Sequence, residues 1–362
     1  MKYVFYLGHP AHFHLFKNVI DDLGGRHSVT VLSRSKDVLE DLLRGSGWAY
    51  TNVLPRGRGD GAVAMTWGLL KRELRLFRVC LRERPDALVG CSPELAHMGW
   101  LLRIPSIITV EDDHDAIPRL ARLTYPFCTA IFAPEGCDVG GYRDKLRTYP
   151  GYHGLAYLHP ERFTPDPQKA ALLRRGRDAF SIVRLSRLVA HHDAGIQGLR
   201  DEDVDAVIDK LSRVGNVWIS TERSLPDRFA RLRLPIAPGD MHHALAFARV
   251  LVSDSQSMTK EAAVLGTPSV RYSDFVGRLS VLDELEREYG LTRGVKPDDR
   301  TSLIAAVERA LVDGESPEWS ERRRCMLADK VDVAGWMIRF LEGLPGTLEH
   351  AGAGEPPGAG RS

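Results

Sequence analysis

No apolar run in the sequence approaches the roughly 20 residues that a membrane-spanning helix needs. The chain has no excess of one charge either: 49 basic residues face 48 acidic ones, which excludes a global field that would attract nucleic acid. The five cysteines are scattered without a CxxC pair, so neither a disulfide framework nor a thiolate zinc site is expected. The apolar start, Met1 to Gly8, is too short for a signal peptide. We therefore expect a cytoplasmic protein, at most peripheral at the inner face of the membrane.

The 362 residues suffice for two α/β domains, and short apolar runs alternate with amphipathic stretches, which is typical of βαβ units and parallel sheet. The pattern predicts strands at 2–7, 28–33, 86–90, 105–110, 129–133, 179–184, 216–220, 250–253 and 268–272. It predicts helices at 13–24, 36–45, 66–84, 93–102, 115–125, 201–213, 257–265, 277–289 and 300–312.

A stretch rich in glycine and proline, 151–175, interrupts this alternation and is predicted to be a linker. The expected fold is therefore α/β, with two doubly wound Rossmann-like domains, 1–150 and 176–330, facing a cleft. Residues 331–345 are expected to form a helix that packs back onto the body. The Gly- and Pro-rich end, 346–362, is expected to be a disordered tail.

The strongest local signal runs from Val252 to Pro268, where an apolar strand stops at Asp254 and a helix opens after a short hydroxyl-rich turn. Such a turn presents backbone N–H groups and the positive end of the helix dipole to a pyrophosphate. A capped helix without a ligand explains the same pattern equally well. The candidate donor-binding residues here are Ser255, Gln256, Ser257, Thr259 and Glu261, the last placed to accept hydrogen bonds from ribose hydroxyls.

Gly8 ends the first predicted strand, and the helix after it begins in a cluster of three histidines. We predict that Gly8 allows close approach of a donor and that His12 is catalytic, because imidazole titrates in the useful range. For His9 and His14 an ordinary surface role is favoured. No nearby carboxylate or thiolate completes a metal set, so no metal is expected.

Four carboxylates and a histidine follow the predicted strand 105–110, at the sheet edge where α/β folds bind ligands. Crowded carboxylates raise one another's pKa, which favours general acid or base chemistry. Asp112 and His114 are the candidates here, with Asp115 as the expected helix cap, and Glu135 follows the next strand at an equivalent place. A solvated loop is the alternative.

The loop after the first strand of the second domain is basic, and we predict that it neutralises a diphosphate. Solvated arginines are almost as good an explanation. The residues concerned are Arg184, Ser186, Arg187, His192 and Asp193, together with His242 on the helix before the strand 250–253.

The turn at 254–257, followed by Glu261-Ala262 and then Gly266-Thr267-Pro268, resembles the donor motif of GT-B glycosyltransferases and of non-hydrolysing UDP-N-acetylglucosamine 2-epimerases. Those families usually have two glycines in the turn, where this chain has Gln256 and Ser257. Over residues 1–340 the chain is similar to a domain-of-unknown-function family of bacteria and archaea described as predicted glycosyltransferases. Its marks here are Gly8–Phe16, Gly90–Ala96, Ile104–Ile107 and Gly151–Pro167.

The resemblance implies a UDP-sugar donor held mainly by the second domain, an acceptor held by the first, and no metal or cofactor. The expected reaction is glycosyl transfer with His12 or Asp112 as the base. A 2-epimerase is the first alternative, although that family has an Asp where this chain has Cys91 and an Arg that this chain lacks. A non-catalytic nucleotide-sugar binding protein is the second.

The predicted helix from Trp67 to Arg84 has an apolar stripe of Trp67, Leu70, Leu74, Phe77 and Leu81 beside a basic face. Such a helix can lie on anionic lipid, which would suit a lipid-linked acceptor. More often the stripe packs on a sheet and the charges are solvated.

Overall fold

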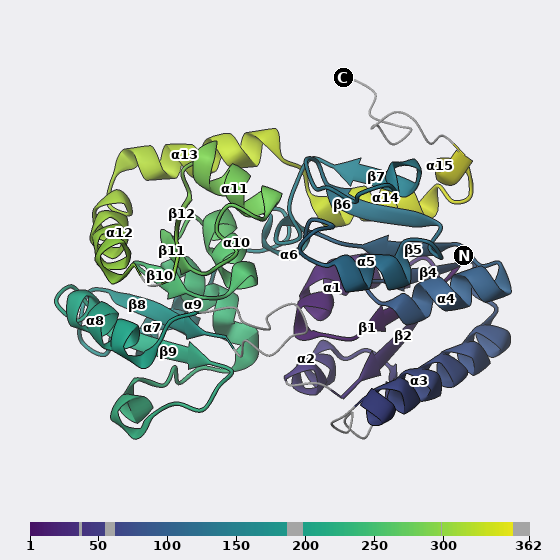
Figure 1. Cartoon of the computed structure of the whole chain (residues 1–362), viewed down its shortest axis with the longest axis horizontal. Helices are drawn as coiled ribbons and strands as arrows, with labels where there is room; N and C mark the ends of the chain where they lie inside the picture. Colours follow the sequence, from purple (N-terminus) through teal and green to yellow (C-terminus); the bar gives the residue numbers. More distant parts are fainter. Residues whose placement is uncertain (36–37, 55–61, 187–197, 298, 350–362) are drawn as a thin grey trace. The chain divides into compact units, whose positions relative to one another are not determined.

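The computed structural model describes residues 1–35, 38–54, 62–186, 198–297 and 299–349; for Leu54, 62–70 and Glu349 it describes the backbone alone. The chain divides into two compact units: residues 1–157 with the chain from Val331 onward, and Leu158–Lys330. Each unit has its own parallel sheet with helices on both faces (Figure 1). The prediction of two doubly wound Rossmann-like domains is thus confirmed.

Unit 1 contains a sheet of seven parallel strands in the order β3-β2-β1-β4-β5-β6-β7. The strands are β1 (Lys2–Leu7), β2 (Ser28–Arg34), β3 (Tyr50–Leu54), β4 (Ala87–Gly90), β5 (Ser106–Thr109), β6 (Ala130–Pro134) and β7 (Leu146–Tyr149). The strand order reverses at β1 and β4, which lie side by side although 79 residues separate the end of β1 from the start of β4. Such a reversal is where open α/β sheets bind ligands.

Alternation along β1 shows how the helices cover both faces of this sheet, because neighbouring side chains of a strand point to opposite faces. Val4 and Tyr6 join a core with residues of three helices: α3 (Ala62–Glu83), α4 (Pro93–Leu102) and α5 (Pro118–Thr124). Phe5 instead packs edge-on against Phe16 of α1 (Pro10–Gly24), and the Tyr3 hydroxyl donates to the Leu341 carbonyl of α14 (Val333–Glu342). The remaining helices of unit 1 are α2 (Leu39–Ser46) and α15 (Gly346–Glu349), with a 3₁₀ turn η1 (Arg143–Lys145).

Unit 2 contains five parallel strands in the order β12-β11-β10-β8-β9, reversing between β8 and β10. They are β8 (Phe180–Leu185), β9 (Asn216–Thr221), β10 (Leu251–Ser253), β11 (Ser269–Tyr272) and β12 (Thr292–Val295). One face packs on α8 (Asp201–Leu211) and α12 (Arg300–Asp313). The other elements are α7 (Pro167–Arg174), α9 (Met241–Phe247), α10 (Gln256–Leu265), α11 (Ser280–Arg287), α13 (Pro317–Asp329), η2 (Asp227–Leu232) and η3 (Pro238–Asp240).

Several segments differ from the expected pattern. Residues 151–175, expected to be a linker, include helix α6 (Leu155–Leu158) and α7, and the units divide after Tyr157. Gly346–Glu349, placed in the tail by prediction, form α15, while 350–362 lie outside the described residues. Asp115 is not a helix cap: α5 begins only at Pro118, with Ile117 at the cap position.

Candidate functional site

The loop after β1 in unit 1 lies at the reversal of strand order and is held by two backbone contacts of Gly8. The Gly8 carbonyl accepts a hydrogen bond from Arg34 Nε at 2.8 Å, and its N–H donates to His12 Nδ1 at 3.2 Å. Because Nδ1 is the acceptor, a neutral His12 ring has its proton on Nε2. The Nε2–H of His12 can therefore donate a hydrogen bond to a developing negative charge. This role fits the geometry better than the predicted role of a base. Its neighbour His9 caps α1, accepting from Ala11 N–H at 3.2 Å.

The adjacent loop after β4 brings Cys91 and Ser92 to the same sheet edge. A Cβ on Gly8 would lie 3.5 Å from Ser92 Oγ and 3.6 Å from Arg34 Nε, so these polar groups border the open side of that glycine. Burial raises the pKa of the Cys91 thiol, opposed only in part by a hydrogen bond with the Thr109 backbone. Cys91 thus stays a neutral thiol and is poorly suited to act as a base.

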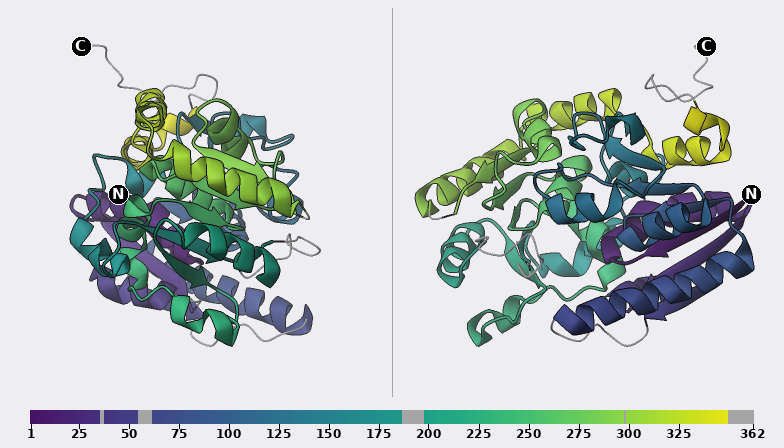
Figure 2. Two further views of the ribbon diagram at one scale, coloured as in Figure 1. Left: turned by 90° about the vertical axis from the view of Figure 1, so that its left-hand side faces the viewer. Right: turned by 45° about the vertical axis from the view of Figure 1, so that its right-hand side comes forward.

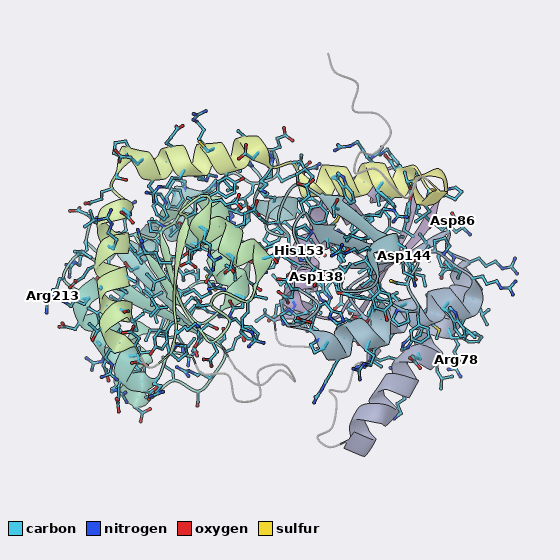
Figure 3. The ribbon with its side chains drawn as sticks, turned by 45° about the horizontal axis from the view of Figure 1, so that its top comes forward. Arg78, Asp86, Asp138, Asp144, His153 and Arg213 are labelled. Carbon is cyan, nitrogen blue, oxygen red and sulfur yellow. The ribbon has the colours of Figure 1, made fainter. Side chains whose placement is uncertain are left out.

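A carboxylate–imidazole pair that the sequence pattern did not reveal lies at the ends of β5 and β7. The side chain of Glu111 is almost fully buried. Its Oε1 accepts a hydrogen bond from the backbone N–H of His153 at 2.7 Å, and its Oε2 lies 3.7 Å from Nδ1 of the His153 ring (His153 is labelled in Figure 3). A carboxylate beside Nδ1 favours the tautomer with the proton on that nitrogen, leaving Nε2, which is shielded from solvent, as the basic position. Burial, and then Glu111, raise the pKa of the neighbouring Tyr149 hydroxyl well above its ordinary value.

The other predicted catalytic residues of unit 1 are dispersed around this edge. Asp112 is half-buried, while Glu135 at the end of β6 is exposed. His114 is half-buried and lies 3.2 Å from the exposed Asp115; a Cβ on Gly140, whose φ is +63°, would lie 3.0 Å from the His114 ring. Asp113, which was not among the predicted catalytic residues, is buried. It accepts a hydrogen bond from the backbone N–H of Asp138 at 2.8 Å, and so it joins the loops after β5 and β6.

The turn between β10 and α10 in unit 2 has the expected helix-start geometry. Ser255 is the N-cap, accepting from Met258 N–H at 3.4 Å, and Thr259 Oγ1 donates to the Ser255 carbonyl at 2.7 Å. Gln256 bridges Ser273 and the fully buried Arg271, at 2.9 and 3.0 Å. Ser257 is exposed at the helix start, whereas Ser255 and Gln256 are half-buried.

Glu261 lies one turn after Ser257 on α10, on the same side of the helix. Its Oε1 lies 3.3 Å from Nε2 of His242, a buried residue of α9, and both side chains are nearly enclosed. The two predicted donor-binding residues are therefore in contact, which fixes the orientation of the carboxylate.

The basic loop after β8, predicted to neutralise a diphosphate, is described only at its start. Arg184 Nη1 donates to Ser220 Oγ at 2.8 Å, and its Nη2 forms an ion pair with Glu222, so this guanidinium is tied to β9. The Ser186 N–H donates to Asp254 Oδ1 at 2.6 Å across the strand reversal. Arg187, His192 and Asp193 lie outside the described residues.

The Asp254 carboxylate should make stability depend on pH. Burial raises its pKa from 3.8 to about 6, although hydrogen bonds with the Ser186 and Leu199 backbone act in the opposite direction. The folded protein thus binds this proton more tightly than the unfolded chain, so stability falls as pH rises from about 4 to about 7, by on the order of 3 kcal/mol. Asp254→Asn has no carboxylate to titrate at this position. Its free energy of unfolding, measured with urea, should therefore decrease less as pH rises over that range. The exposed Asp227→Asn is the control, and equal pH slopes for Asp254→Asn and the parent would contradict the assignment.

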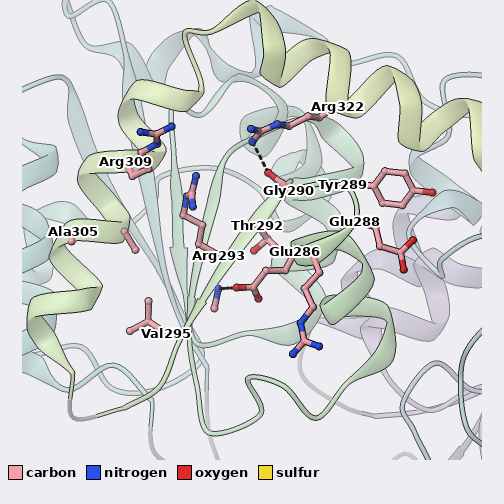
Figure 4. A pocket seen from close by; sticks show the side chains of 13 residues that line it. Glu286, Glu288, Tyr289, Gly290, Thr292, Arg293, Val295, Ala305, Arg309 and Arg322 are labelled. Carbon is pink, nitrogen blue, oxygen red and sulfur yellow. Dashed lines mark hydrogen bonds between the residues drawn. The ribbon is translucent and has the colours of Figure 1, made fainter.

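A groove of about 770 Å³ lies elsewhere in unit 2, along the edge strand β12 (Figure 4). Arg293, Arg309 and Arg322 line it, but the first two pair with Asp313 and the third donates to the Gly290 carbonyl. Glu286 Oε1 accepts the Gly294 N–H at 2.8 Å and so caps the open strand edge. The groove is two strands away from the reversal at β8 and β10 and is not part of the predicted donor site.

Within the described parts of the chain, no group of three His, Cys, Asp or Glu side chains is arranged to hold a metal ion. No helix there is both long enough and apolar enough to cross a bilayer.

No protein-family model matches the chain, and no curated protein matches its sequence. Solved structures share its fold. A UDP-GlcNAc 2-epimerase from Neisseria meningitidis, bound to UDP-GlcNAc, is 15% identical with a TM-score of 0.65, over 95% of this chain and 99% of that one. The UDP-GlcNAc 2-epimerase from Methanocaldococcus jannaschii is 16% identical with a TM-score of 0.59, over 88% and 94%. CalG4, the calicheamicin glycosyltransferase, is 14% identical with a TM-score of 0.54, over 97% and 99%.

These likenesses confirm the expected fold relation to both the 2-epimerases and the GT-B transferases. At such identities they establish the fold alone. No family model supports the more specific resemblance to the predicted-glycosyltransferase group.

Proposed function

We propose that this chain is an enzyme acting on UDP-sugars, and that its reaction is glycosyl transfer to an acceptor. The observation that carries the proposal is the pairing, on one side of α10, of a helix start with an exposed serine and a glutamate one turn further on. The helix start offers N–H groups and a positive dipole to a diphosphate. Glu261, oriented by His242, would accept hydrogen bonds from the ribose hydroxyls.

Unit 1 would supply the acid–base chemistry. His153 beside Glu111 would be the general base: the carboxylate lies 3.7 Å from Nδ1, and Nε2, which is buried, would have to become accessible to the acceptor. His12, with Nδ1 engaged by Gly8, would donate from Nε2 to negative charge that develops on the donor. Asp112 remains a second candidate base near Glu111.

Transfer is favoured over epimerisation by the environment of Cys91. The 2-epimerase family that the sequence resembles has an acid at this position, whereas here burial keeps the thiol neutral. The fold likeness to 2-epimerases makes epimerisation at C2 the second candidate, and a fold shared with both classes does not separate them.

Glu261→Gln should weaken UDP binding by about 10- to 100-fold, because hydrogen bonds to a charged group contribute about 1.5–3 kcal/mol. The amide keeps the packing against His242, so the unliganded melting temperature should change little. Titration calorimetry with UDP measures the loss, and thermal shift with UDP reports it independently.

Glu318→Ala is the matched control, because this glutamate is also near a helix start of unit 2 but is exposed on α13. Its UDP affinity should equal that of the parent. Absence of any binding of UDP or UDP-sugars to the parent at millimolar concentration would refute the donor assignment.

A further inference from the structure

Helix α3 leaves part of the apolar stripe that its sequence suggested exposed, although Phe77 of that stripe packs against the core of unit 1. The side chains packed into the core of unit 1 are Leu76, Val79 and Cys80. Leu74 and Leu81 of the stripe are 51% and 54% exposed, while Phe77 is half-buried and the side chains of Trp67 and Leu70 lie outside the described residues. Exposed leucines are unusual on a helix that packs against a sheet. They place part of the stripe on the outer surface of unit 1.

The neighbouring helices α4 and α5 add further exposed apolar side chains. Trp100 is 65% exposed, Leu101 54% and Leu123 52%. His97 joins the three helices: its Nδ1 lies 2.8 Å from Glu73 of α3, and its Nε2 lies 2.8 Å from the Leu123 carbonyl of α5. Because Trp100 and Leu101 follow His97 by three and four residues, they lie on the same side of α4 as this seam.

The three helices lie side by side over one face of the sheet in both Figure 1 and Figure 2. We name the outer surface of α3, α4 and α5 the outer helical face. Its exposed apolar residues are Leu74, Leu81, Trp100, Leu101 and Leu123.

The charges of the outer helical face are almost all positive. Of the acids of α3, Glu73 is paired with His97 and Glu83 with Arg82. Arg75 also serves the fold, because its Nη1 donates to the Val53 carbonyl at 2.6 Å. The exposed basic residues of α3 and α5 are Lys71, Arg75, Arg78, Arg82, Arg119 and Arg122 (Arg78 is labelled in Figure 3).

We propose that the outer helical face binds the surface of an anionic lipid bilayer. Tryptophan and leucine side chains enter the boundary between head groups and acyl chains, while arginines contact lipid phosphates. A two-fold contact between copies through this face would bring the same basic residues opposite one another and repel. Charge complementarity therefore favours lipid over a second copy. The proposal does not depend on the UDP-sugar assignment.

The test is sedimentation of the full chain with vesicles of phosphatidylglycerol and phosphatidylcholine, against vesicles of phosphatidylcholine alone. The parent should bind the anionic vesicles, and binding should decrease strongly when salt is raised to about 0.5 M. The combined variant Arg78→Gln, Arg82→Gln and Arg122→Gln should lower the partition coefficient about 100-fold, since each basic residue near such a surface contributes about fivefold. Trp100→Gln with Leu101→Gln should lower it without changing the salt dependence.

Matched controls come from unit 2, where Val312 is 64% exposed and Arg213 lies on the surface (Figure 3). Val312→Gln and Arg213→Gln should bind vesicles as the parent does. Circular dichroism and the melting temperature show whether each variant is folded. Because the arginine and the tryptophan–leucine variants are independent, failure of one to fold leaves the other decisive.

No binding of the parent to anionic vesicles overturns the proposal, as does equal binding by the outer-face variants and the parent. Concentration-dependent dimers that these variants abolish, seen by light scattering without vesicle binding, would assign the face to a second copy instead.

Discussion

His153→Ala is expected to lower turnover by about 10²–10⁴-fold while leaving UDP affinity unchanged, because a positioned general base contributes that much to rate and nothing to donor binding. Glu111→Gln should lose a large part of the same contribution to turnover, since it removes the negative charge beside Nδ1 of His153. His12→Ala should act differently, depressing turnover through lost stabilisation of the departing group. NMR of a mixture with UDP-N-acetylglucosamine follows UDP release and the configuration at C2 together.

His114→Ala is the matched control, since this histidine is half-buried and its ring lies beside Asp115 and Gly140. Without an acceptor, the parent should release UDP slowly by hydrolysis and give no manno-configured product, and an acceptor should raise the release. Formation of the C2 epimer without UDP release would establish the epimerase instead. Full activity of His153→Ala would reject the base assignment and point to Asp112.

Glu94→Ala is expected to destabilise unit 1 by about 3–5 kcal/mol, because it leaves a buried arginine without its counter-charge. Arg72 Nε on α3 and Glu94 Oε1 at the start of α4 are 2.6 Å apart, and both side chains are less than a tenth exposed. For a unit of this size the loss corresponds to a decrease in Tm of roughly 10 °C, which calorimetry resolves. Glu94 also acts on Tyr6, whose hydroxyl pKa is raised first by burial and then by this carboxylate.

Replacing both partners, Arg72→Met with Glu94→Leu, should recover most of the stability, since apolar side chains of similar volume avoid the desolvation of two charges. The exposed pair of Arg44 with Asp41 gives the control: Arg44→Ala should change stability by about 1 kcal/mol or less. Equal effects of Glu94→Ala and Arg44→Ala would show that the inner pair is solvated in solution.

The interior strands were predictable from sequence because they are covered on both faces, so each is a short continuous apolar run. The three strands that the sequence pattern missed, β3, β7 and β12, are all at sheet edges. An edge strand is half-exposed, so Leu146–Tyr149 and Thr292–Val295 contain arginines, and periodicity does not mark them as strands. Helix α13 was missed for a related reason: only Trp319 and Met326 of its thirteen residues are buried.

For the candidate site, too, the local sequence pattern revealed some features and not others. Strand ends followed by polar or hydroxyl-rich turns identified the regions around Gly8, Glu111 and Ser255 from sequence, since parallel strands bring their carboxyl ends to one edge. Local patterns contain no information about which residues meet across the sheet, and His153 was therefore assigned to a linker although it contacts Glu111, 42 residues earlier.

Composition and periodicity thus determined that this chain forms two parallel α/β units, because burial of apolar runs is a local property of the sequence. Tertiary packing decided the pairings on which the proposed chemistry rests: His12 with Gly8, His153 with Glu111, and Glu261 with His242. It also decided which side of α3 is buried. A helix with apolar residues on more than one side has several possible core faces, and only the packing of Leu76 and Val79 against the sheet selects one and leaves Leu74 and Leu81 exposed.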